Sequence, residues 1–211
     1  MAHCLSQLVV MLMGEEFFVV AALGDSLTRG YRMRDPFAMD QRVPYPAQLE
    51  ILLRLKLGRM VFVVNAGLNG DLTEGMIGRF NMDVASERPE AVVVWGGIND
   101  LGHAITPDHV MANLKKLYEL CTEIKATPIG CTLTPTRRTS IAMLRLNDMI
   151  RTHTSVKGII LADLYPTLAD AEGNLRQEYS DDGAHLTVEG YRRVAEVVLD
   201  ALSPILPKIE S

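Results

Sequence analysis

Five short runs of mainly apolar residues recur along the chain and alternate with amphipathic segments. Where such a run is uninterrupted and rich in β-branched residues, it is typical of a strand that is buried on both faces. The runs are residues 17–23, 60–64, 91–95, 127–133 and 159–162. The first run leads into Gly24, Asp25 and Ser26, and we expect the rest of the fold to be organised around it.

The segments between the runs show helical periodicity and capping signals. Residues 44–57 are expected to form a helix that ends at Gly58, since glycine readily adopts the left-handed conformation of a helix C-terminus. Threonine, a favoured N-cap residue, stands before three further segments. These threonines are Thr73, Thr106 and Thr187, and a fifth helix carries Ile141, Leu144 and Ile150.

Strands and helices therefore alternate five times along the chain. Neighbouring parallel strands need crossover connections, and helices supply them on both faces of a sheet. The predicted fold class is α/β, a three-layer α/β/α sandwich with a five-stranded parallel sheet. Ligands bind at the carboxyl edge of such a sheet, where the loops after the strands meet.

Three of the loops that follow predicted strands carry small and polar residues. They cover residues 24–28, 65–71 and 96–100. The second loop is too rich in glycine and asparagine to continue a strand, so we expect the second strand to end at Val64. All three loops are expected at the same edge of the sheet.

A hydroxyl, an imidazole and a carboxylate near these loops form a candidate catalytic set. The Ser26 hydroxyl becomes a nucleophile only when an adjacent imidazole takes its proton. Among the five histidines, His185 suits this task because it lies just before a helix and three residues after Asp182. A turn would let the carboxylate accept from one ring nitrogen while the other nitrogen faces Ser26.

An acyl-transfer site also needs hydrogen-bond donors where negative charge develops. The candidates are the backbone N–H of Ser26, the backbone N–H of Gly70 and the side-chain amide of Asn99. Gly70 suits this role because a residue without Cβ lets the backbone approach a substrate closely. Asp25 and Asp100 are interpreted as structural residues that hold their loops through backbone N–H groups.

The order of these residues resembles the GDSL, or SGNH, hydrolase family over residues 19–202. The matching positions are Gly24, Asp25, Ser26 and Leu27, then Gly70, then Gly97, Asn99 and Asp100, and finally Asp182 and His185. The resemblance implies a flavodoxin-like sandwich and serine-dependent hydrolysis of esters or thioesters. It further implies a triad of Ser26, Asp182 and His185, an oxyanion hole of Ser26, Gly70 and Asn99, and no metal or organic cofactor.

Within the family, two different branches are suggested by different segments. Residues 24–33 and 65–71 resemble the multifunctional bacterial thioesterase and lysophospholipase branch. Residues 172–191 resemble esterases that act on acetylated sugars, so a carbohydrate O-acetylesterase is an alternative and the acyl-chain length stays open. The candidate substrate contacts are Tyr31, Met33, Phe37, His103 and Arg137.

Two hypotheses come from other functional classes. A noncatalytic phosphate- or nucleotide-binding domain of flavodoxin type would use residues 24–28, but it leaves Asp182 and His185 without a role. A metal-dependent phosphoesterase would draw its ligands from Asp25, Asn99, Asp182 and His185.

Composition narrows the expected partners, location and domain organisation. The 211 residues, 48% apolar, suit one hydrolase domain at residues 15–211 after an N-terminal extension at 1–14. A net charge of -5 gives no reason to expect nucleic acid, which leaves a small acyl ester or thioester as partner of a monomer or small homo-oligomer. Three cysteines without metal-ligand spacing predict reduced thiols and a cytoplasmic protein, and no segment suits stable membrane insertion.

Overall fold

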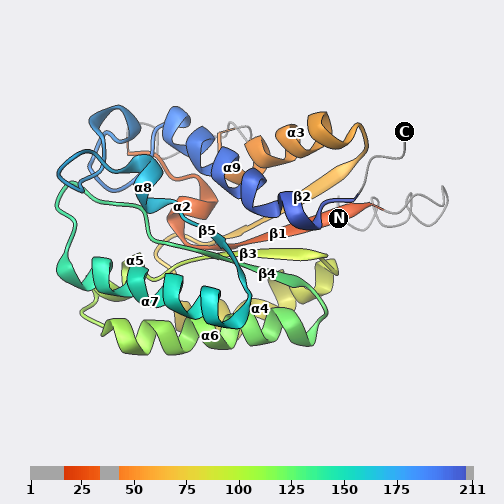
Figure 1. Ribbon diagram of the computed structural model, residues 1–211, viewed down its shortest axis with the longest axis horizontal. Helices are drawn as coiled ribbons and strands as arrows, with labels where there is room; N and C mark the ends of the chain where they lie inside the picture. The colour runs from red at the N-terminus through yellow and green to blue at the C-terminus, as the bar shows by residue number, and fades with distance from the viewer. Residues whose placement is uncertain (1–16, 34–42, 208–211) are drawn as a thin grey trace.

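The computed structural model describes residues 17–33 and 43–207, which form a five-stranded parallel sheet between two layers of helices (Figure 1). The strand order is β2-β1-β3-β4-β5. Because β1 and β3 are neighbours without being consecutive, the direction of winding reverses between them, which is where open sheets of this kind bind ligands. The predicted fold class is confirmed. The strands are β1 (Phe18–Gly24), β2 (Val61–Gly67), β3 (Ala91–Trp95), β4 (Thr127–Cys131) and β5 (Ile160–Ala162).

The longer helices cover the two faces of the sheet. In Figure 1, α3 and α9 lie on one face, and α4, α6 and α7 lie on the other. These helices are α3 (Tyr45–Leu57), α4 (Thr73–Asp83), α6 (Pro107–Glu123), α7 (Ile141–Lys157) and α9 (Val188–Leu202). Short helices are α2 (Ser26–Arg29), α5 (Ile98–Gly102), α8 (Tyr165–Leu168), and the 3-10 turns η1 (Ala85–Glu87), η2 (Gln177–Tyr179) and η3 (Ser203–Ile205).

The alternation of side chains along the central strand β1 divides the apolar interior into two cores. Val20 and Ala22 pack on the side of α3 and α9, whereas Ala21 and Leu23 pack on the side of α4, α6 and α7. All four side chains are fully buried, as expected for a strand in the middle of a covered parallel sheet.

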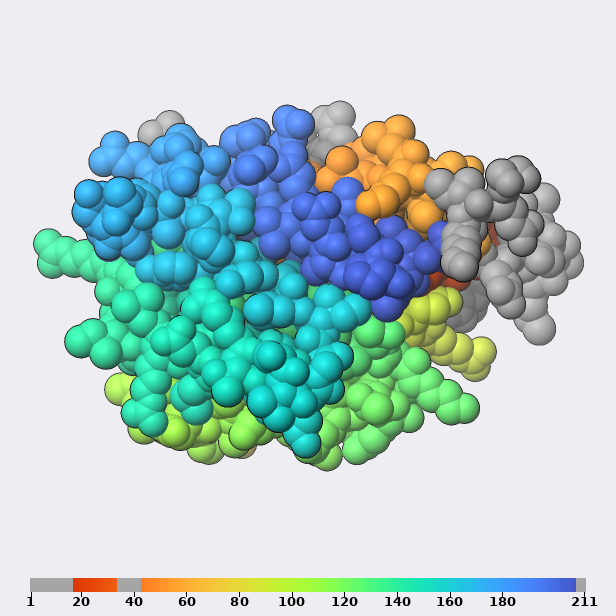
Figure 2. Space-filling model, in the orientation of Figure 1, coloured from red at the N-terminus to blue at the C-terminus, as the bar shows by residue number. Residues whose placement is uncertain are grey.

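In the space-filling view of Figure 2, α9 (dark blue) forms part of the outer surface. The lighter blue segment that precedes α9 in the chain lies beside one end of it.

Local capping signals predict several helix ends correctly. The Thr106 side chain accepts a hydrogen bond from the His109 N–H at 3.4 Å, and Thr187 accepts from the Gly190 N–H at 3.2 Å. Gly58 ends α3 with φ +62° and donates its N–H to the Arg54 carbonyl. These three predictions are confirmed because each cap depends only on residues within a few positions.

The prediction that the second strand ends at Val64 is wrong. The strand continues in register beside β1 as far as the pair Gly24 and Gly67. Asn65 does not break it, since its Oδ1 accepts the Gly67 N–H at 3.0 Å. A Cβ on Gly67 would lie 2.2 Å from the backbone nitrogen of Arg29. The glycine therefore accommodates the close approach of α2 and does not mark the end of the strand.

One further expectation about the helices needs correction. Leu72 is the N-cap of α4, and Thr73 instead donates its hydroxyl to Asp100 Oδ1 at 2.6 Å. The predicted fifth helix is present as α7, in which Ile141 and Leu144 are exposed to 85% and 41%. The buried face of α7 consists of Met143, Leu146, Asn147, Ile150 and Thr154.

Some predictions concern segments for which the structure gives no description. The expected N-terminal extension, residues 1–14, falls in this category. Within residues 17–33 and 43–207, no helix combines the length and the apolar character needed to cross a bilayer.

Candidate active site

The chain turns sharply from β1 into α2, and Ser26 is the first residue of that helix. Asp25 is the N-cap, and its Oδ1 accepts the Leu27 N–H at 2.9 Å. A Cβ on Gly24 would lie 2.1 Å from Thr28 Oγ1, so only glycine lets the helix fold back so tightly. This local geometry holds the Ser26 side chain at the carboxyl edge of the sheet.

Ser26, His185 and Asp182 form a hydrogen-bonded chain at this edge. The distance from Ser26 Oγ to His185 Nε2 is 3.1 Å, and the distance from His185 Nδ1 to Asp182 Oδ2 is 2.8 Å. With the ring proton on Nδ1, the imidazole donates to the carboxylate and Nε2 is left to accept from the serine hydroxyl. The arrangement can remove a proton from Ser26 while Asp182 stabilises the resulting positive charge.

The Asp182 carboxylate is held by its own turn. Its Oδ1 accepts the N–H groups of Ala184 and His185, each at 2.8 Å. Partial burial would raise the pKa of this carboxyl, but the hydrogen bonds from the His185 ring and from the two backbone N–H groups outweigh burial and lower it. Asp182 is therefore ionised near neutral pH and can hold the imidazole in one orientation.

Ser180 stabilises the turn that carries the histidine, and it was not singled out in the sequence. Its hydroxyl donates to the His185 carbonyl at 2.6 Å and accepts the Gly183 N–H at 2.8 Å. A serine two residues before the aspartate has no distinctive pattern, because its partners depend on how the turn closes.

The three candidate oxyanion donors lie at the ends of adjacent strands. Ser26 follows β1, Gly70 follows β2, and Asn99 follows β3 within α5. The Asn99 side chain donates one amide hydrogen to the Asp71 carbonyl at 3.0 Å, which fixes the amide plane and leaves the second hydrogen available. The assignment of these donors to an oxyanion hole stays a prediction.

The backbone conformation gives a further reason for a glycine at position 70. A Cβ added there would meet no protein atom within 4 Å, and close approach to a substrate stays a prediction. Gly70 has φ +75°, a left-handed conformation that residues other than glycine rarely adopt. This conformation determines the direction of the Gly70 N–H at the exposed tip of the loop.

Asp25 and Asp100 are buried and make the structural contacts expected of them. Asp25 caps α2, and Asp100 binds both the N–H and the hydroxyl of Thr73, thereby joining the second and third loops. Burial raises the pKa of Asp25 to about 7, and the nearby charges of Asp100 and Asp71 add to the effect. A cluster of acidic groups thus lies beneath the candidate site.

Arg79 of α4 is a second residue that was not singled out. Its guanidinium binds Asp71, Asp83 and the Gly24 carbonyl. A signal did exist, because Arg79 lies three residues after the buried Met76 and next to the buried Phe80, on the inward side of the helix.

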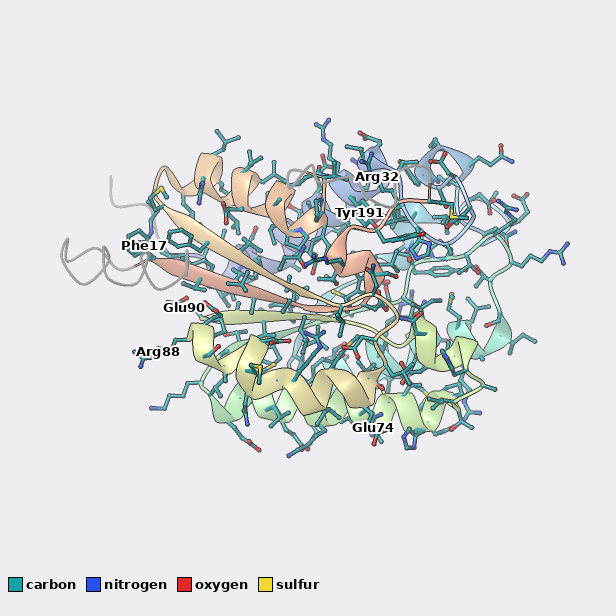
Figure 3. All side chains as sticks on the ribbon, turned by 180° about the vertical axis from the view of Figure 1, so that it is seen from behind. Phe17, Arg32, Glu74, Arg88, Glu90 and Tyr191 are labelled. Atoms are coloured by element: carbon teal, nitrogen blue, oxygen red, sulfur yellow. The ribbon has the colours of Figure 1, made fainter. Side chains whose placement is uncertain are left out.

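Two of the candidate substrate contacts lie beside His185 or the turn that carries Asp182. The Tyr31 and His185 rings have centroids 4.6 Å apart, and the Tyr31 carbonyl accepts the Tyr191 hydroxyl at 2.7 Å. The Arg137 N–H donates to the Gly183 carbonyl at 2.6 Å, beside the turn that carries Asp182. Figure 3 shows Tyr191 in the same region as Arg32, away from Phe17 and Glu90.

The other candidate contacts are less closely associated with the site. His103 is exposed and its Nδ1 lies 2.8 Å from the Asn99 carbonyl. Met33 is 58% exposed, and Phe37 lies outside the described residues. Whether any of these residues contacts substrate stays a prediction.

The residues suggested for a metal-dependent phosphoesterase do not gather around one point. Within the described parts of the chain, no group of three or more His, Cys, Asp or Glu side chains could hold a metal ion. Asp25 and Asp182 instead cap separate turns, as their hydrogen bonds show. The structure thus gives no support to a ligand set drawn from Asp25, Asn99, Asp182 and His185.

Two sequence comparisons show what the chain is similar to. The sequence model of the GDSL-like lipase/acylhydrolase family matches residues 22–193. An arylesterase of Vibrio mimicus is 27% identical over 192 residues, which cover 85% of this chain and 86% of the relative.

Solved structures share the fold at low sequence identity. The lipase/acylhydrolase from Enterococcus faecalis aligns with a TM-score of 0.77 and 23% identity, over 92% of this chain and 99% of that one. A mutant of an acetyl-xylooligosaccharide esterase from Geobacillus Stearmophilus aligns with a TM-score of 0.73 and 18% identity, over 92% and 97% of the two chains.

Proposed function

The chain belongs to the GDSL-like lipase/acylhydrolase family, and from this premise we propose that it hydrolyses carboxylic esters or thioesters through an acyl-enzyme on Ser26. The observation that carries the proposal is the hydrogen-bonded chain from Ser26 Oγ through His185 to Asp182. The competing hypothesis of a noncatalytic phosphate-binding domain gives these three hydrogen-bonded side chains no role. The family match does not support that hypothesis either.

In the first half of the reaction, Ser26 Oγ attacks the carbonyl carbon of the substrate while His185 Nε2 takes the hydroxyl proton. The carbonyl oxygen becomes an oxyanion in a tetrahedral intermediate. As the intermediate collapses, His185 gives the proton to the departing alcohol or thiol, and the acyl group stays on Ser26.

In the second half, water replaces the serine as the nucleophile. His185 takes a proton from water, the resulting hydroxide attacks the acyl carbon, and a second oxyanion forms. The proton then returns to Ser26 Oγ as the carboxylic acid departs, which regenerates the starting state. Asp182 stays ionised throughout, since hydrogen bonds to its carboxylate lower its pKa, and it stabilises each imidazolium that forms.

The oxyanion in both halves would accept hydrogen bonds from the Ser26 N–H, the Gly70 N–H and the free amide hydrogen of Asn99. Their positions after three adjacent strands support this assignment. Each such donor typically contributes about 10²- to 10³-fold to the rate, because it interacts more strongly with the charged intermediate than with the neutral ester.

The acyl and leaving groups are open within the family. Similarity to an arylesterase supports an ester as substrate, and the thioesterase and lysophospholipase activities rest on sequence resemblance alone. The predicted domain limits of 15–211, the monomeric or small oligomeric state and the cytoplasmic location also stay predictions.

A specific observation favours acetylated sugars as a second candidate substrate. A pocket of about 430 Å³ lies beside the turn of Asp182, and its polar lining includes Arg137, Asn174, Arg176 and Gln177. Such side chains suit hydroxyl-rich ligands. Initial rates on an acetylated xylo-oligosaccharide and on an acyl thioester at equal concentration would distinguish the two candidates.

Fluorophosphonate labelling tests the proposed function, since this reagent reacts with serines that have an active base and an oxyanion site. We expect a single adduct on Ser26, found by intact mass and peptide mapping. Ser26→Ala and His185→Ala should each lose labelling and lower ester turnover by at least about 10³-fold.

The matched control is His109→Ala, which removes an exposed histidine at the start of α6 and should label like the wild-type protein. Circular dichroism melts would verify that each variant is folded. Absence of an adduct on folded wild-type protein, or an adduct that persists in His185→Ala, would contradict the proposal.

A further inference from the structure

We infer that Arg79 is a positioning residue for catalysis, because one largely buried guanidinium binds two of the loops that carry the candidate oxyanion donors and reaches the third through Asp71. The inference rests on the proposed function, which identifies those donors. The Arg79 side chain is only 15% exposed, and its three nitrogens bind three different acceptors.

The first contact holds the end of β1. Arg79 Nη2 donates to the Gly24 carbonyl at 2.9 Å, two residues before Ser26. The same carbonyl accepts the Leu68 N–H at 3.1 Å, so both of its lone pairs are used. The start of the serine turn and the start of the Gly70 loop are thereby attached to one oxygen atom.

The second contact holds the loop that follows β2. Arg79 Nε donates to Asp71 Oδ2 at 2.7 Å, and the Asp71 side chain is 9% exposed. Asp71 directly follows Gly70, and its Oδ1 accepts the Leu72 N–H at 3.0 Å. Fixing both carboxylate oxygens restricts the motion of Asp71, the residue that directly follows Gly70.

The same residue connects Arg79 to the loop that follows β3. The Asp71 carbonyl accepts the Asn99 amide at 3.0 Å. A path of two hydrogen bonds therefore leads from the guanidinium to the third donor, with Asp71 as its only intermediate residue. No other described side chain binds both Gly24 and Asp71 directly, so Arg79 is the common support of the three loops.

The charge of Arg79 has a second consequence for catalysis. Asp71 and Asp100 both lie near Asp25, and the proposed oxyanion develops at the loops that hold these carboxylates. Arg79 neutralises the Asp71 carboxylate, whereas its loss would leave a nearly buried anion next to the developing oxyanion. Replacing Arg79 by a neutral residue should therefore destabilise the transition state more than it weakens the binding of the uncharged ester.

Steady-state kinetics of Arg79→Gln test this inference. We expect kcat to fall by at least about 10-fold while KM changes less than about twofold, because the donors act mainly in the transition state. The rate constant of fluorophosphonate labelling should fall in parallel. Should Arg79→Gln fail to fold, Arg79→Lys, which keeps the charge but loses the forked geometry, carries the same test.

Arg54→Gln is the matched control. Arg54 also joins a carboxylate to a strand carbonyl, with Glu50 at 2.7 Å and the Val61 carbonyl at 3.0 Å, but it does so at the opposite end of β2. It should lower the melting temperature without lowering kcat at temperatures where the variant is folded. Equal kcat values for Arg79→Gln and Arg54→Gln would overturn the positioning role.

A double-mutant cycle with Asn99→Ala tests the path through Asp71. In the Asn99→Ala background, Arg79→Gln should lower kcat less than it does in the wild-type background, since part of its effect passes through Asn99. Fully multiplicative effects would contradict that path. If the wild-type protein neither labels nor turns over ester, the proposed function fails, and the role of Arg79 fails with it.

Discussion

The carboxyl group of Asp25 is buried beneath the turn that carries Ser26. Its raised pKa makes the stability of the protein depend on pH. Burial raises its pKa from 3.8 to about 7. Between these values the folded protein keeps a proton that the unfolded chain has lost. The contribution of Asp25 to stability is therefore complete below about pH 4 and is lost as the pH rises through about 7.

Replacing this carboxyl by an amide should remove that pH dependence. Asp25→Asn retains an oxygen that can accept the Leu27 N–H. The free energy of unfolding of the variant minus that of the wild-type protein should increase by roughly 2 to 3 kcal/mol from about pH 5 to about pH 8. Urea titrations at both pH values measure the change, with Asp200→Asn as a control at an exposed position. A constant difference between variant and wild type would contradict the raised pKa.

The short helix α5 determines where the third loop presents Asn99 and Asp100. It begins after Gly97, which has φ +117° and packs against α6. One turn of helix then presents Asn99 toward the second loop and Asp100 toward Thr73. The position of the Asn99 amide therefore depends on the conformation of Gly97.

An alanine at position 97 should disturb both stability and catalysis. Its Cβ would lie 2.9 Å from Val110 Cγ1 at a backbone angle that alanine rarely adopts. We expect Gly97→Ala to lower the free energy of unfolding by roughly 1 to 3 kcal/mol and to lower kcat, since Asn99 would shift.

Gly102→Ala, in the same helix, is the control because its Cβ would meet nothing within 4 Å. It should change the free energy of unfolding by less than about 1 kcal/mol and leave kcat unchanged. Denaturant titration and ester kinetics measure both quantities. Equal behaviour of the two variants would show that the start of α5 does not determine the position of Asn99.

At the scale of the whole molecule, the two cores share a single sheet. The central strand β1 contributes side chains to both cores, and its neighbour β3 does the same with Val93 on one side and Val92 on the other. Since both cores pack on the same strands, loss of packing in one core would disturb the strands that support the other. The two cores should therefore unfold together.

Large-to-small substitutions in the two cores should therefore affect one transition. Leu202→Ala belongs to the core beneath α3 and α9, and Leu117→Ala to the core above α6. Each should lower the free energy of unfolding by about 2 to 5 kcal/mol. Far-UV and near-UV circular dichroism should follow the same single transition in both variants.

Leu55→Ala, at a position 77% exposed, is the control and should change that free energy by less than about 0.5 kcal/mol. Two separate transitions in either core variant would contradict the prediction of one domain.

Local residue patterns by themselves determined the five strands, the five longer helices and most of the caps that were predicted. Apolar runs, helical spacing and capping residues act over a few positions, which is why Thr106, Thr187 and Gly58 behave as predicted. Repetition of these local patterns also specified the parallel sheet, because alternating strands and helices permit few other arrangements. The candidate site residues could be found in the same way, since each follows a predicted strand or precedes a predicted helix.

Only the tertiary structure decided how those residues are joined. Ser26 meets His185 across 159 positions, and Arg79 binds the Gly24 carbonyl across 55. The extension of β2 to Gly67 and the bond from Thr73 to Asp100 likewise depend on partners that are distant in sequence. Such contacts leave no periodic signal in the chain, because their energies arise only when folding brings separate strand ends to one edge of the sheet.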